Sequence, residues 1–350
     1  MGVNILDTPR LFRYYYFMAT QDIPNSLIEV IRYFSDVDVC IEFVASLRWM
    51  NGVVCPHCES KNVGFLKTRR IWKCRGCRKQ FSVKTGTIFE ESPIALDKWL
   101  MAIWLVVNCK NGISSYEIAR DLKVTQKSAW FMLHRIRLAL KNGSWEKMGG
   151  SEGGACEIDE TFVGGKLRNM HKDRALALKM GAKGQPANSY HTRHANKTAV
   201  FGMLDSESRQ VRAKVVPNVK REVLQNEILK NIHHGSTVYS DQAVAYDKLK
   251  ENYIHETVNH VNAYVEGNVH TNGLENFWSL MKRSLAGTYV AVEPFHLNAY
   301  LDEQMFRFNN RATKDNPLND ADRFMLAVSQ ISGKRLTYAE LTGKVAATQF

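Results

Sequence analysis

The pattern of hydrophobic and polar positions divides the chain into a helical first half and a second half that begins with strands. Residues 97–107 form an apolar run of the length of a buried helix. Residues 155–163 alternate between apolar and polar side chains and contain β-branched and aromatic types, which is typical of a strand. Glycine and serine concentrate between these two regions, so a linker is expected at residues 143–154.

A pair of short helices is predicted in the first half. The first covers residues 114–122, and Ser114 with Glu117 has the spacing of a capping box. A break at residues 123–125 leads into the second helix, residues 126–137. This arrangement is typical of a helix-turn-helix, in which the start of the second helix meets base edges and phosphates. The residues at that position are Gln126, Lys127 and Ser128. Helix pairs of this kind also occur as plain packing units, so both interpretations stay open.

Alternating segments continue through the second half of the chain. They predict strands and helices in the order strand 199–204, strand 211–216, helix 221–229, strand 237–241, helix 272–283 and helix 296–311. Together with the strand at 155–163, this is the connectivity of a ribonuclease H-like fold. In that fold the first and fourth strands lie adjacent and parallel. The basic stretch 166–197 is expected to be a long loop or insertion.

Three acidic residues occupy corresponding places in this predicted fold. Asp159 lies in the middle of the first strand, Asp241 ends the fourth, and Glu275 lies on the later helix. Lys282 follows Glu275 by seven residues, about 20° short of two helical turns, so both project from one face. Taken singly, Asp241 would serve as a helix cap and Glu275 as a surface charge, and Glu160 is expected to be a surface charge. The joint order of the three acids favours a shared site.

Carboxylates in this arrangement suit phosphodiester chemistry. Attack on a DNA phosphate uses two Mg²⁺ or Mn²⁺ ions about 3.5–4 Å apart, one activating the nucleophile and one stabilising the leaving oxygen. Such hard cations require oxygen ligands. The sequence therefore predicts a magnesium or manganese site built from Asp159, Asp241 and Glu275.

Four cysteines form two close pairs ahead of the helix pair. The pairs are Cys55 with Cys58 and Cys74 with Cys77, and the 15 residues between them suffice for a β-hairpin. Four thiolates complete a closed tetrahedral shell, which predicts a structural Zn²⁺ site of the zinc-ribbon type. Two disulfides are the alternative, and they are disfavoured in a chain without a secretory signal.

Basic and aromatic residues alternate along the predicted ribbon. Arg69, Arg70 and Arg75 lie among Phe65, Trp72 and other basic side chains, a composition that suits nucleic acid. A solvated hairpin face would look similar. The formal net charge of +12 makes a polyanionic partner the default expectation.

Composition completes the classification. A length of 350 residues exceeds the roughly 100–200 of one domain, so several domains are expected. Neither a membrane-spanning run nor a cleavable leader is recognised, which predicts a soluble cytoplasmic protein without a membrane partner. The predicted fold class is multidomain α+β, with a zinc ribbon and a helix-turn-helix followed by a ribonuclease H-like α/β catalytic domain. The expected divisions are an N-terminal helical segment at 1–50, the ribbon at 51–84, the helix-turn-helix region at 94–142, the linker at 143–154, the catalytic domain at 155–312 and a C-terminal tail at 313–350.

Three segments resemble bacterial insertion-sequence transposases of the ISXO-like, Merlin-related group. They are residues 158–166, 239–241 and 270–283, and the ribbon resembles that group's N-terminal half, so the resemblance covers about residues 36–312. It implies a transposase with a DD(E/N) site that recognises terminal inverted repeats in double-stranded DNA, cuts donor DNA and joins the freed ends to a target. It further implies a nucleoid-associated protein that works as a homodimer or higher oligomer in the synaptic complex.

Carried over by residue, the resemblance makes Asp159 and Asp241 the first two ligands and Lys282 the basic residue after the third. Members of the group present either Asn or Glu as the third residue, and this chain has both Asn272 and Glu275. Glu275 is preferred because an ionised carboxylate binds Mg²⁺ better than an amide. Two other functions stay open: a non-enzymatic, domesticated DNA-binding regulator, and a nuclease without strand transfer.

Overall fold

The chain forms two compact units in the computed structural model. Unit 1 combines Met1–Ser144 with Asp302–Phe350, and unit 2 is Trp145–Leu301. The structure describes residues 24–141, 146–150, 154–165, 171–173, 197–241, 246, 249, 252–258, 272–314 and 316–345. Most of the predicted loop 166–197, parts of the linker 143–154 and residues 1–23 of the N-terminal segment lie outside the described residues. Among the described helices, none is long and apolar enough to cross a membrane.

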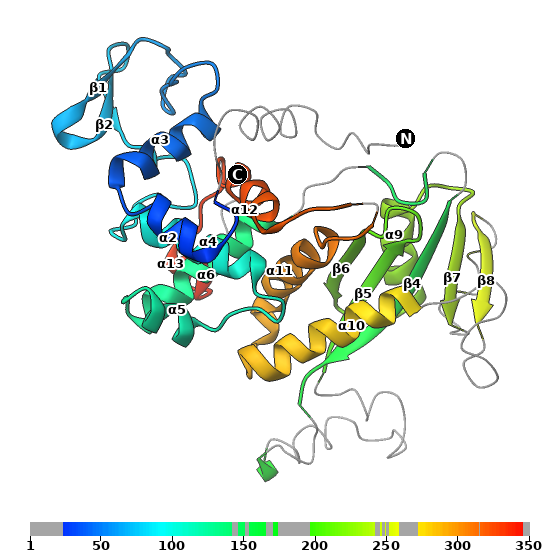
Figure 1. Ribbon diagram of the computed structural model, residues 1–350. Helices are drawn as coiled ribbons and strands as arrows, with labels where there is room; N and C mark the ends of the chain where they lie inside the picture. The colour runs from blue at the N-terminus through cyan, green and yellow to red at the C-terminus, as the bar shows by residue number, and fades with distance from the viewer. Residues whose placement is uncertain are drawn as a thin grey trace. The chain divides into compact units, whose positions relative to one another are not determined.

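Unit 1 begins with two helices and the ribbon. Helix α2 (Leu27–Tyr33) precedes α3 (Val37–Arg48), whose N-cap residue Asp36 accepts a hydrogen bond from the Asp38 N–H. The ribbon is an antiparallel sheet in the order β1-β2-β3, of which β1 and β2 are labelled in Figure 1. Its strands are β1 (Val63–Leu66), β2 (Ile71–Cys74) and β3 (Gln80–Phe81), with the short 3-10 helix η1 (Lys67–Arg69) in the hairpin. The hairpin predicted between the cysteine pairs is therefore confirmed.

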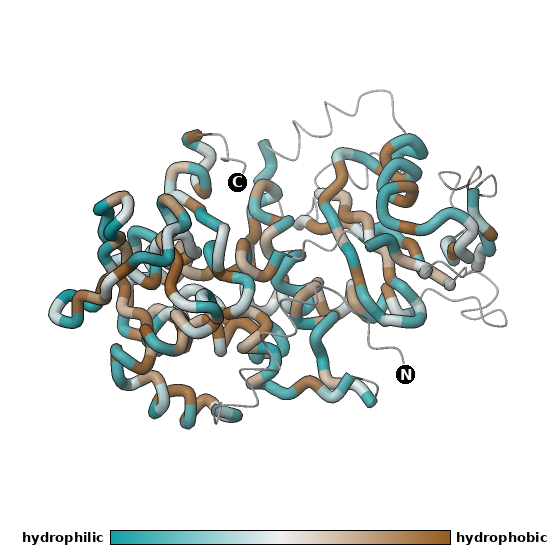
Figure 2. The backbone as a smooth tube through the Cα atoms, turned by 90° about the horizontal axis from the view of Figure 1, so that it is seen from above, coloured by the Kyte–Doolittle hydropathy of each residue, from teal (hydrophilic) through white to brown (hydrophobic). Residues whose placement is uncertain are grey.

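Three helices follow the ribbon: α4 (Leu96–Asn108), α5 (Ser115–Asp121) and α6 (Gln126–Leu140). Most of α4 is buried, as its apolar run predicts. The capping box is confirmed, because the Ser114 side chain accepts from the Glu117 N–H and the Glu117 carboxylate accepts from the Ser114 N–H. In Figure 2, hydrophobic and hydrophilic stretches alternate along the helices, as amphipathic packing requires.

The C-terminal segment completes the core of unit 1. Helix α11 (Leu297–Asn309) begins in unit 2 and ends in unit 1, where α12 (Asp320–Ser329) and the short α13 (Tyr338–Leu341) follow. Phe324 of α12 stacks on Phe43 of α3, with ring centroids 5.9 Å apart. The segment that the sequence presents as a tail thus fills a hydrophobic core.

Unit 2 is built around a five-stranded mixed sheet in the order β6-β5-β4-β7-β8. The first strand β4 pairs antiparallel with the second, β5, and parallel with the fourth, β7. The strands are β4 (Ala155–Val163), β5 (Thr198–Asp205), β6 (Val211–Val216), β7 (Thr237–Asp241) and β8 (Ile254–Val258). The predicted adjacency of the first and fourth strands is confirmed.

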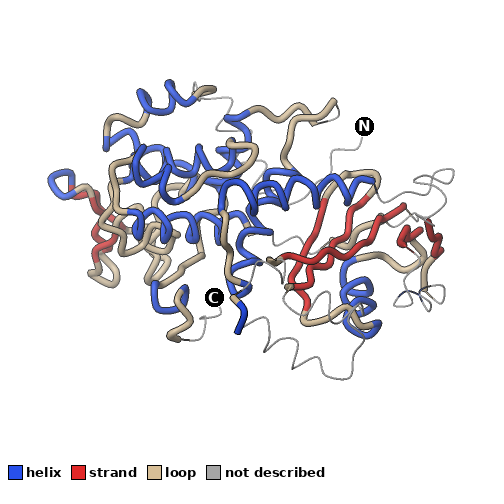
Figure 3. Tube along the Cα trace, turned by 90° about the horizontal axis from the view of Figure 1, so that it is seen from below, coloured by secondary structure: helices blue, strands red, loops and turns tan. Residues whose placement is uncertain are grey.

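Helices cover both faces of this sheet. Cys156 and Ile158 of β4 join a hydrophobic core with Leu224 and Ile228 of α9 (Arg221–Asn231). Helix α10 (Asn272–Ser284) lies across the opposite face, as Figures 1 and 3 show. A five-residue π-helical segment, η5 (Leu285–Tyr289), continues α10, and the 3-10 turn η6 (Pro294–His296) precedes α11. Since side chains alternate along a strand, the odd-numbered residues of β4 face α10.

Candidate active site and zinc centre

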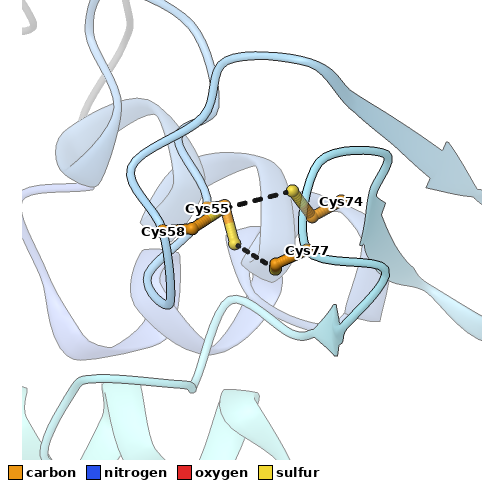
Figure 4. Close-up of side chains that lie close together, drawn as sticks. All are labelled: Cys55, Cys58, Cys74 and Cys77. Carbon is orange, nitrogen blue, oxygen red and sulfur yellow. Dashed lines mark hydrogen bonds between the residues drawn. The ribbon is translucent and has the colours of Figure 1, made fainter.

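The four predicted cysteine ligands converge in the ribbon. Their sulfur atoms all lie within 4.8 Å of one another. The Cys55–Cys77 and Cys58–Cys74 sulfur pairs are 3.7 and 3.6 Å apart (Figure 4). Four sulfurs about 2.3 Å from a central Zn²⁺ would be about 3.8 Å apart at the corners of a tetrahedron. The cluster therefore fits a structural zinc ion and leaves no position for a reacting molecule.

The backbone of each cysteine loop favours thiolate ligands. The His57 N–H donates to Cys55 Sγ over 3.4 Å. Around the second pair, the backbone N–H of Cys77 lowers the pKa of the Cys74 thiol to about 6. The Lys79 N–H acts in the same direction on Cys77, but burial and the neighbouring cysteines raise the pKa of Cys77 to about 11, so Cys74 is the thiol that ionises first. Because only the thiolate binds zinc, these N–H donors prepare the ligands for the metal.

The predicted DNA-binding residues of the ribbon have different surroundings. The Arg70 guanidinium forms a paired ion bridge with Asp38, at 2.5 and 3.0 Å, and this holds the pKa of Asp38 below its usual range. Arg69 donates to the Gln80 side chain over 3.3 Å, and Arg75 is exposed. Arg70 is thus already engaged with an acid of the same unit.

The start of α6 carries the other predicted DNA-binding residues. Gln126 donates to the Ser115 hydroxyl over 2.9 Å, and the Thr125 hydroxyl donates to the Ser128 hydroxyl over 2.8 Å. The exposed Lys127 places its ammonium 4.7 Å from the centre of the Tyr338 ring. The contacts of Gln126 and Ser128 stabilise the turn between α5 and α6, and the Lys127 contact joins α6 to α13.

Asp159 and Asp241 lie on the same face of the sheet of unit 2. Glu157 of β4 pairs with Tyr239 of β7, and two residues further along each strand lie Asp159 and Asp241. Side chains two residues apart share a face, so both aspartates point toward the side that α10 covers. The strand order therefore brings together two acids that are distant in the sequence.

The electrostatics of Asp159 show a crowded acidic site. Burial raises the pKa of Asp159 to about 6, against the lowering effect of a hydrogen bond from the Trp278 indole N–H at 2.9 Å. The negative charges of Asp241 and Glu275 raise it as well. A carboxylate in this position is costly to ionise unless a cation compensates the charge.

Helix α10 presents the remaining predicted site residues on its exposed side. Asn272 begins the helix, and Glu275 and Lys282 are exposed on it. The predicted helical placement of Glu275 and Lys282 is confirmed. Among the described residues, the one group of three or more His, Cys, Asp or Glu side chains close enough to share a metal ion is the set of four cysteines, whose sulfur atoms lie within 4.8 Å of one another. Asp159, Asp241 and Glu275 thus act on one another electrostatically without forming so tight a cluster.

The expectation for Glu160 is wrong. It faces the core side of the sheet, is half-buried, and is not a free surface charge. Burial raises its pKa to about 7, the Tyr246 phenol lowers it, and the charges of Asp159 and Asp241 raise it. Strand alternation places it on the face opposite Asp159, where the hydrophobic core desolvates it.

Sequence reasoning missed several residues that hold the site together. Trp278 bonds Asp159, and its ring has room because Gly202 lies directly beneath it on β5, paired with Asp159. A Cβ added to Gly202 would lie 2.5 Å from Trp278 Cζ2. A glycine inside a strand often marks such a close approach, so this signal was present in the sequence.

Two family models and one curated relative match this chain. Residues 152–309 match the ISXO2-like transposase domain, and residues 35–80 match the transposase zinc-ribbon domain. An uncharacterized protein in transposable element ISH50 of Halobacterium salinarum is 29% identical over 252 residues, which are 69% of this chain and 81% of that protein.

Among solved structures, the simian T-cell lymphotropic virus intasome in complex with PP2A regulatory subunit B56 gamma aligns with a TM-score of 0.29 and 14% identity. The alignment covers 61% of this chain and 70% of the matched chain, and a likeness this distant carries no argument. The two family matches do, and they confirm the resemblance in the sequence motifs: residues 152–309 are similar to the ISXO2-like transposase domain and residues 35–80 to a transposase zinc ribbon.

Proposed function

We propose that this chain is a DNA transposase that binds the terminal inverted repeats of an insertion sequence, cleaves DNA at those ends and joins them to a target. The observation that carries the proposal is the placement of Asp159 under α10, where Asp241 and Glu275 both raise the pKa of its carboxyl group. The three acids come from three separate elements, β4, β7 and α10, and residues 152–309 match the ISXO2-like transposase domain, which supports the proposal.

The topology of unit 2 supports a ribonuclease H-like catalytic domain. Its strand order β6-β5-β4-β7-β8 places the third, second, first, fourth and fifth strands of the sheet side by side. The first three strands are antiparallel and the last two run parallel to the first. This supports the connectivity expected from the sequence.

The acidic residues fit two hard divalent cations. Asp159 is half-buried near like charges, which Mg²⁺ or Mn²⁺ would compensate, and Asp241 and Glu275 would supply further oxygen ligands. Acids that serve two ions need not lie within the ligand shell of one, which suits their looser grouping. When bound, such ions activate the attacking oxygen and stabilise the leaving oxygen of a phosphodiester.

The residues of the chain have distinct roles in this proposal. Asp159 and Asp241 bind the cations from the sheet, and Glu275 binds from the helix, with Asn272 as its rival. Lys282, on the same face of α10 as Glu275, meets a DNA phosphate. In this proposal the basic residues bind DNA phosphates and the acidic residues bind the cations.

DNA recognition is assigned to unit 1. Helices α5 and α6 serve as a helix-turn-helix that presents Lys127 with Gln126 and Ser128, and the ribbon adds Arg75, Arg69 and Arg70. Two ends must be held together before joining, so the protein acts as a dimer or higher oligomer on double-stranded DNA in the cytoplasm, at the nucleoid.

The test uses purified protein and duplexes carrying the terminal inverted repeats that flank its coding sequence. We expect Mg²⁺- or Mn²⁺-dependent cleavage, followed by joining of a pre-cut end to target DNA. Asp159→Asn and Asp241→Asn should abolish both reactions while leaving repeat binding intact. Glu275→Gln and Asn272→Ala are assayed as separate single variants. The residue whose substitution abolishes strand transfer is the third ligand.

The outcomes separate the alternatives. A protein that binds the repeats but never cuts them, with either metal, refutes the transposase proposal and supports a DNA-binding regulator. Cleavage without joining of a pre-cut end supports a nuclease that lacks strand transfer. Cleavage that survives Asp159→Asn would remove the acidic site from the reaction.

A further inference from the structure

A fourth acid, Glu157, lies next to the proposed metal ligands. It is on β4, two residues before Asp159 and on the same face, and its side chain is 0% exposed. A buried carboxylate requires partners that compensate its charge. Its position beside Asp159 suggests a further metal ligand, but its contacts indicate a different role.

The partners of Glu157 lie at the start of α10. Its Oε2 accepts a hydrogen bond from the backbone N–H of Leu274 over 2.9 Å. Leu274 is in the first turn of the helix, where N–H groups have no partner within the helix and carry partial positive charge. The other oxygen, Oε1, lies 3.6 Å from Nη1 of Arg209. Glu157 thus caps a helix that begins 115 residues later in the chain.

Gly273 makes this contact possible. A Cβ at position 273 would lie 2.7 Å from Oε1 and 3.0 Å from Oε2 of Glu157. No side chain fits there unless the carboxylate or the helix moves. The glycine in the first turn of α10 therefore provides the space that the buried carboxylate occupies.

A second hydrogen bond attaches α10 to the same strand. Trp278 Nε1 donates to Asp159 Oδ2 over 2.9 Å. From Leu274 to Trp278 the helix rises about 6 Å, and from Glu157 to Asp159 the strand rises about 6.6 Å. Because these rises nearly match, one turn of helix lies in register with two residues of strand, and both bonds form together.

We infer that Glu157 is a positioning residue that fixes the start of α10, and with it Glu275, over Asp159. The inference rests on the proposed function, since it concerns how that site is assembled. The Glu157–Leu274 hydrogen bond fixes one end of this helical turn against β4, and the Trp278–Asp159 hydrogen bond fixes the other. Glu275 directly follows the anchored Leu274, so its placement depends on the Glu157 contact.

The test compares Glu157→Ala with Glu157→Gln, which keeps an oxygen that accepts the Leu274 N–H. Glu222→Gln is the control, because Glu222 is an exposed acid in the first turn of α9. The first measurement is amide hydrogen exchange of residues 272–278 in metal-free protein, which needs no activity. We expect Glu157→Ala to speed exchange at Leu274 about tenfold or more, with Glu157→Gln close to the parent chain.

The second measurement is the rate of cleavage per folded molecule across a range of Mg²⁺ concentrations. We expect Glu157→Ala to lose about 10–100-fold or to require correspondingly more Mg²⁺, as when a residue that orients metal ligands is removed. Glu157→Gln should restore most of this loss. Trp278→Phe, which keeps a ring but removes the donor, should weaken cleavage in the same direction.

Two results would overturn the inference. Unchanged exchange and unchanged cleavage in Glu157→Ala would show that the contact does not position α10. Complete loss in both Glu157 variants, with exchange unchanged, would make Glu157 a ligand. If the parent chain itself never cleaves, the proposed function fails, while the exchange measurement still decides whether Glu157 anchors the helix.

Discussion

Gly202 offers a sharp test of how closely α10 must lie on the sheet. It pairs with Asp159 across β4 and β5, beneath the ring of Trp278. In a Gly202→Ala variant, the new Cβ would lie 2.5 and 2.6 Å from two ring carbons of Trp278 and 3.2 Å from Leu274 Cδ1. The strand itself tolerates alanine, so the effect comes from the helix above it.

The size of the effect follows from these distances. Carbon atoms pack at about 3.5–4.0 Å, so the Trp278 ring must move by about 1 Å or more. Overpacking of this kind costs about 1–3 kcal/mol of folding free energy. The 2.9 Å bond from Trp278 to Asp159 would lengthen to about 4 Å, which is no longer a hydrogen bond. A misplacement of about 1 Å near reacting groups can slow a reaction by about 100-fold.

The assay is Mg²⁺-dependent cleavage of a duplex that carries the terminal repeats. The rate is expressed per folded molecule, and thermal denaturation gives the folded fraction. Gly165→Ala is the matched control, because a Cβ at Gly165 meets no atom within 4 Å. We expect the cleavage rate of Gly202→Ala to be about 10–100-fold below that of the parent chain, whereas Gly165→Ala keeps the parent rate. If Gly202→Ala cleaved as fast as Gly165→Ala, the close fit of Trp278 over Asp159 would be irrelevant to the reaction.

Three other predictions concern unit 1. Burial raises the pKa of Asp302 from 3.8 to about 6, so the folded state binds its proton more tightly and loses stability as pH rises from about 4 to about 6. The full shift corresponds to about 3 kcal/mol, and partial exposure of the side chain reduces this to about 2 kcal/mol. Asp302→Asn should therefore raise the free energy of unfolding by about 2 kcal/mol at pH 7 and leave it unchanged below pH 4, as measured by urea denaturation. Zinc removal by a chelator, or Cys58→Ser, should unfold the ribbon and abolish repeat binding in gel shifts, because structural zinc supplies on the order of 10 kcal/mol. Arg75→Ala should weaken DNA binding and lower its salt dependence, whereas Arg70→Ala, whose parent side chain pairs with Asp38, should change anisotropy titrations less; equal effects would contradict this.

Much of unit 2 could be predicted from the sequence, because its strands either alternate between apolar and polar residues or, like β5, form a continuous apolar run. The strands 155–163, 211–216 and 237–241 have the predicted bounds, and β5 extends the predicted strand by one residue at each end. Strand β8 was not predicted. It is a short edge strand that begins at an exposed residue, Ile254, so it lacks the apolar signal of a buried strand.

The positions of the proposed acids on β4, β7 and α10 could be predicted, but the contacts around them could not. Asp159 and Asp241 follow from strand order, which a sequence pattern can indicate. The bonds of Glu157 to Leu274 and of Asp159 to Trp278 join residues 117 and 119 positions apart. They depend on where α10 settles on the sheet, and helical periodicity shows only that α10 has one buried side.

The C-terminal segment was beyond prediction for a related reason. An amphipathic pattern at α12 indicates a buried face but does not name its partner. The partner is a set of aromatic side chains, Phe34, Phe43 and Trp104, against which Phe324 packs. The chain therefore returns to its first unit after forming the second, and the core of unit 1 is complete only when the last helices are in place.

The choice between Asn272 and Glu275 depends on charge more than on placement. Residues three apart on a helix project about 60° apart, so α10 exposes both, and the buried Gly273 and Leu274 between them are held against Glu157. Of these two residues, Glu275 is the one whose negative charge acts on Asp159, in addition to that of Asp241. Like charges make the site costly without cations and strengthen cation binding by the same interactions. A neutral amide contributes nothing to that difference, so the electrostatics of the site favour Glu275 as the third ligand.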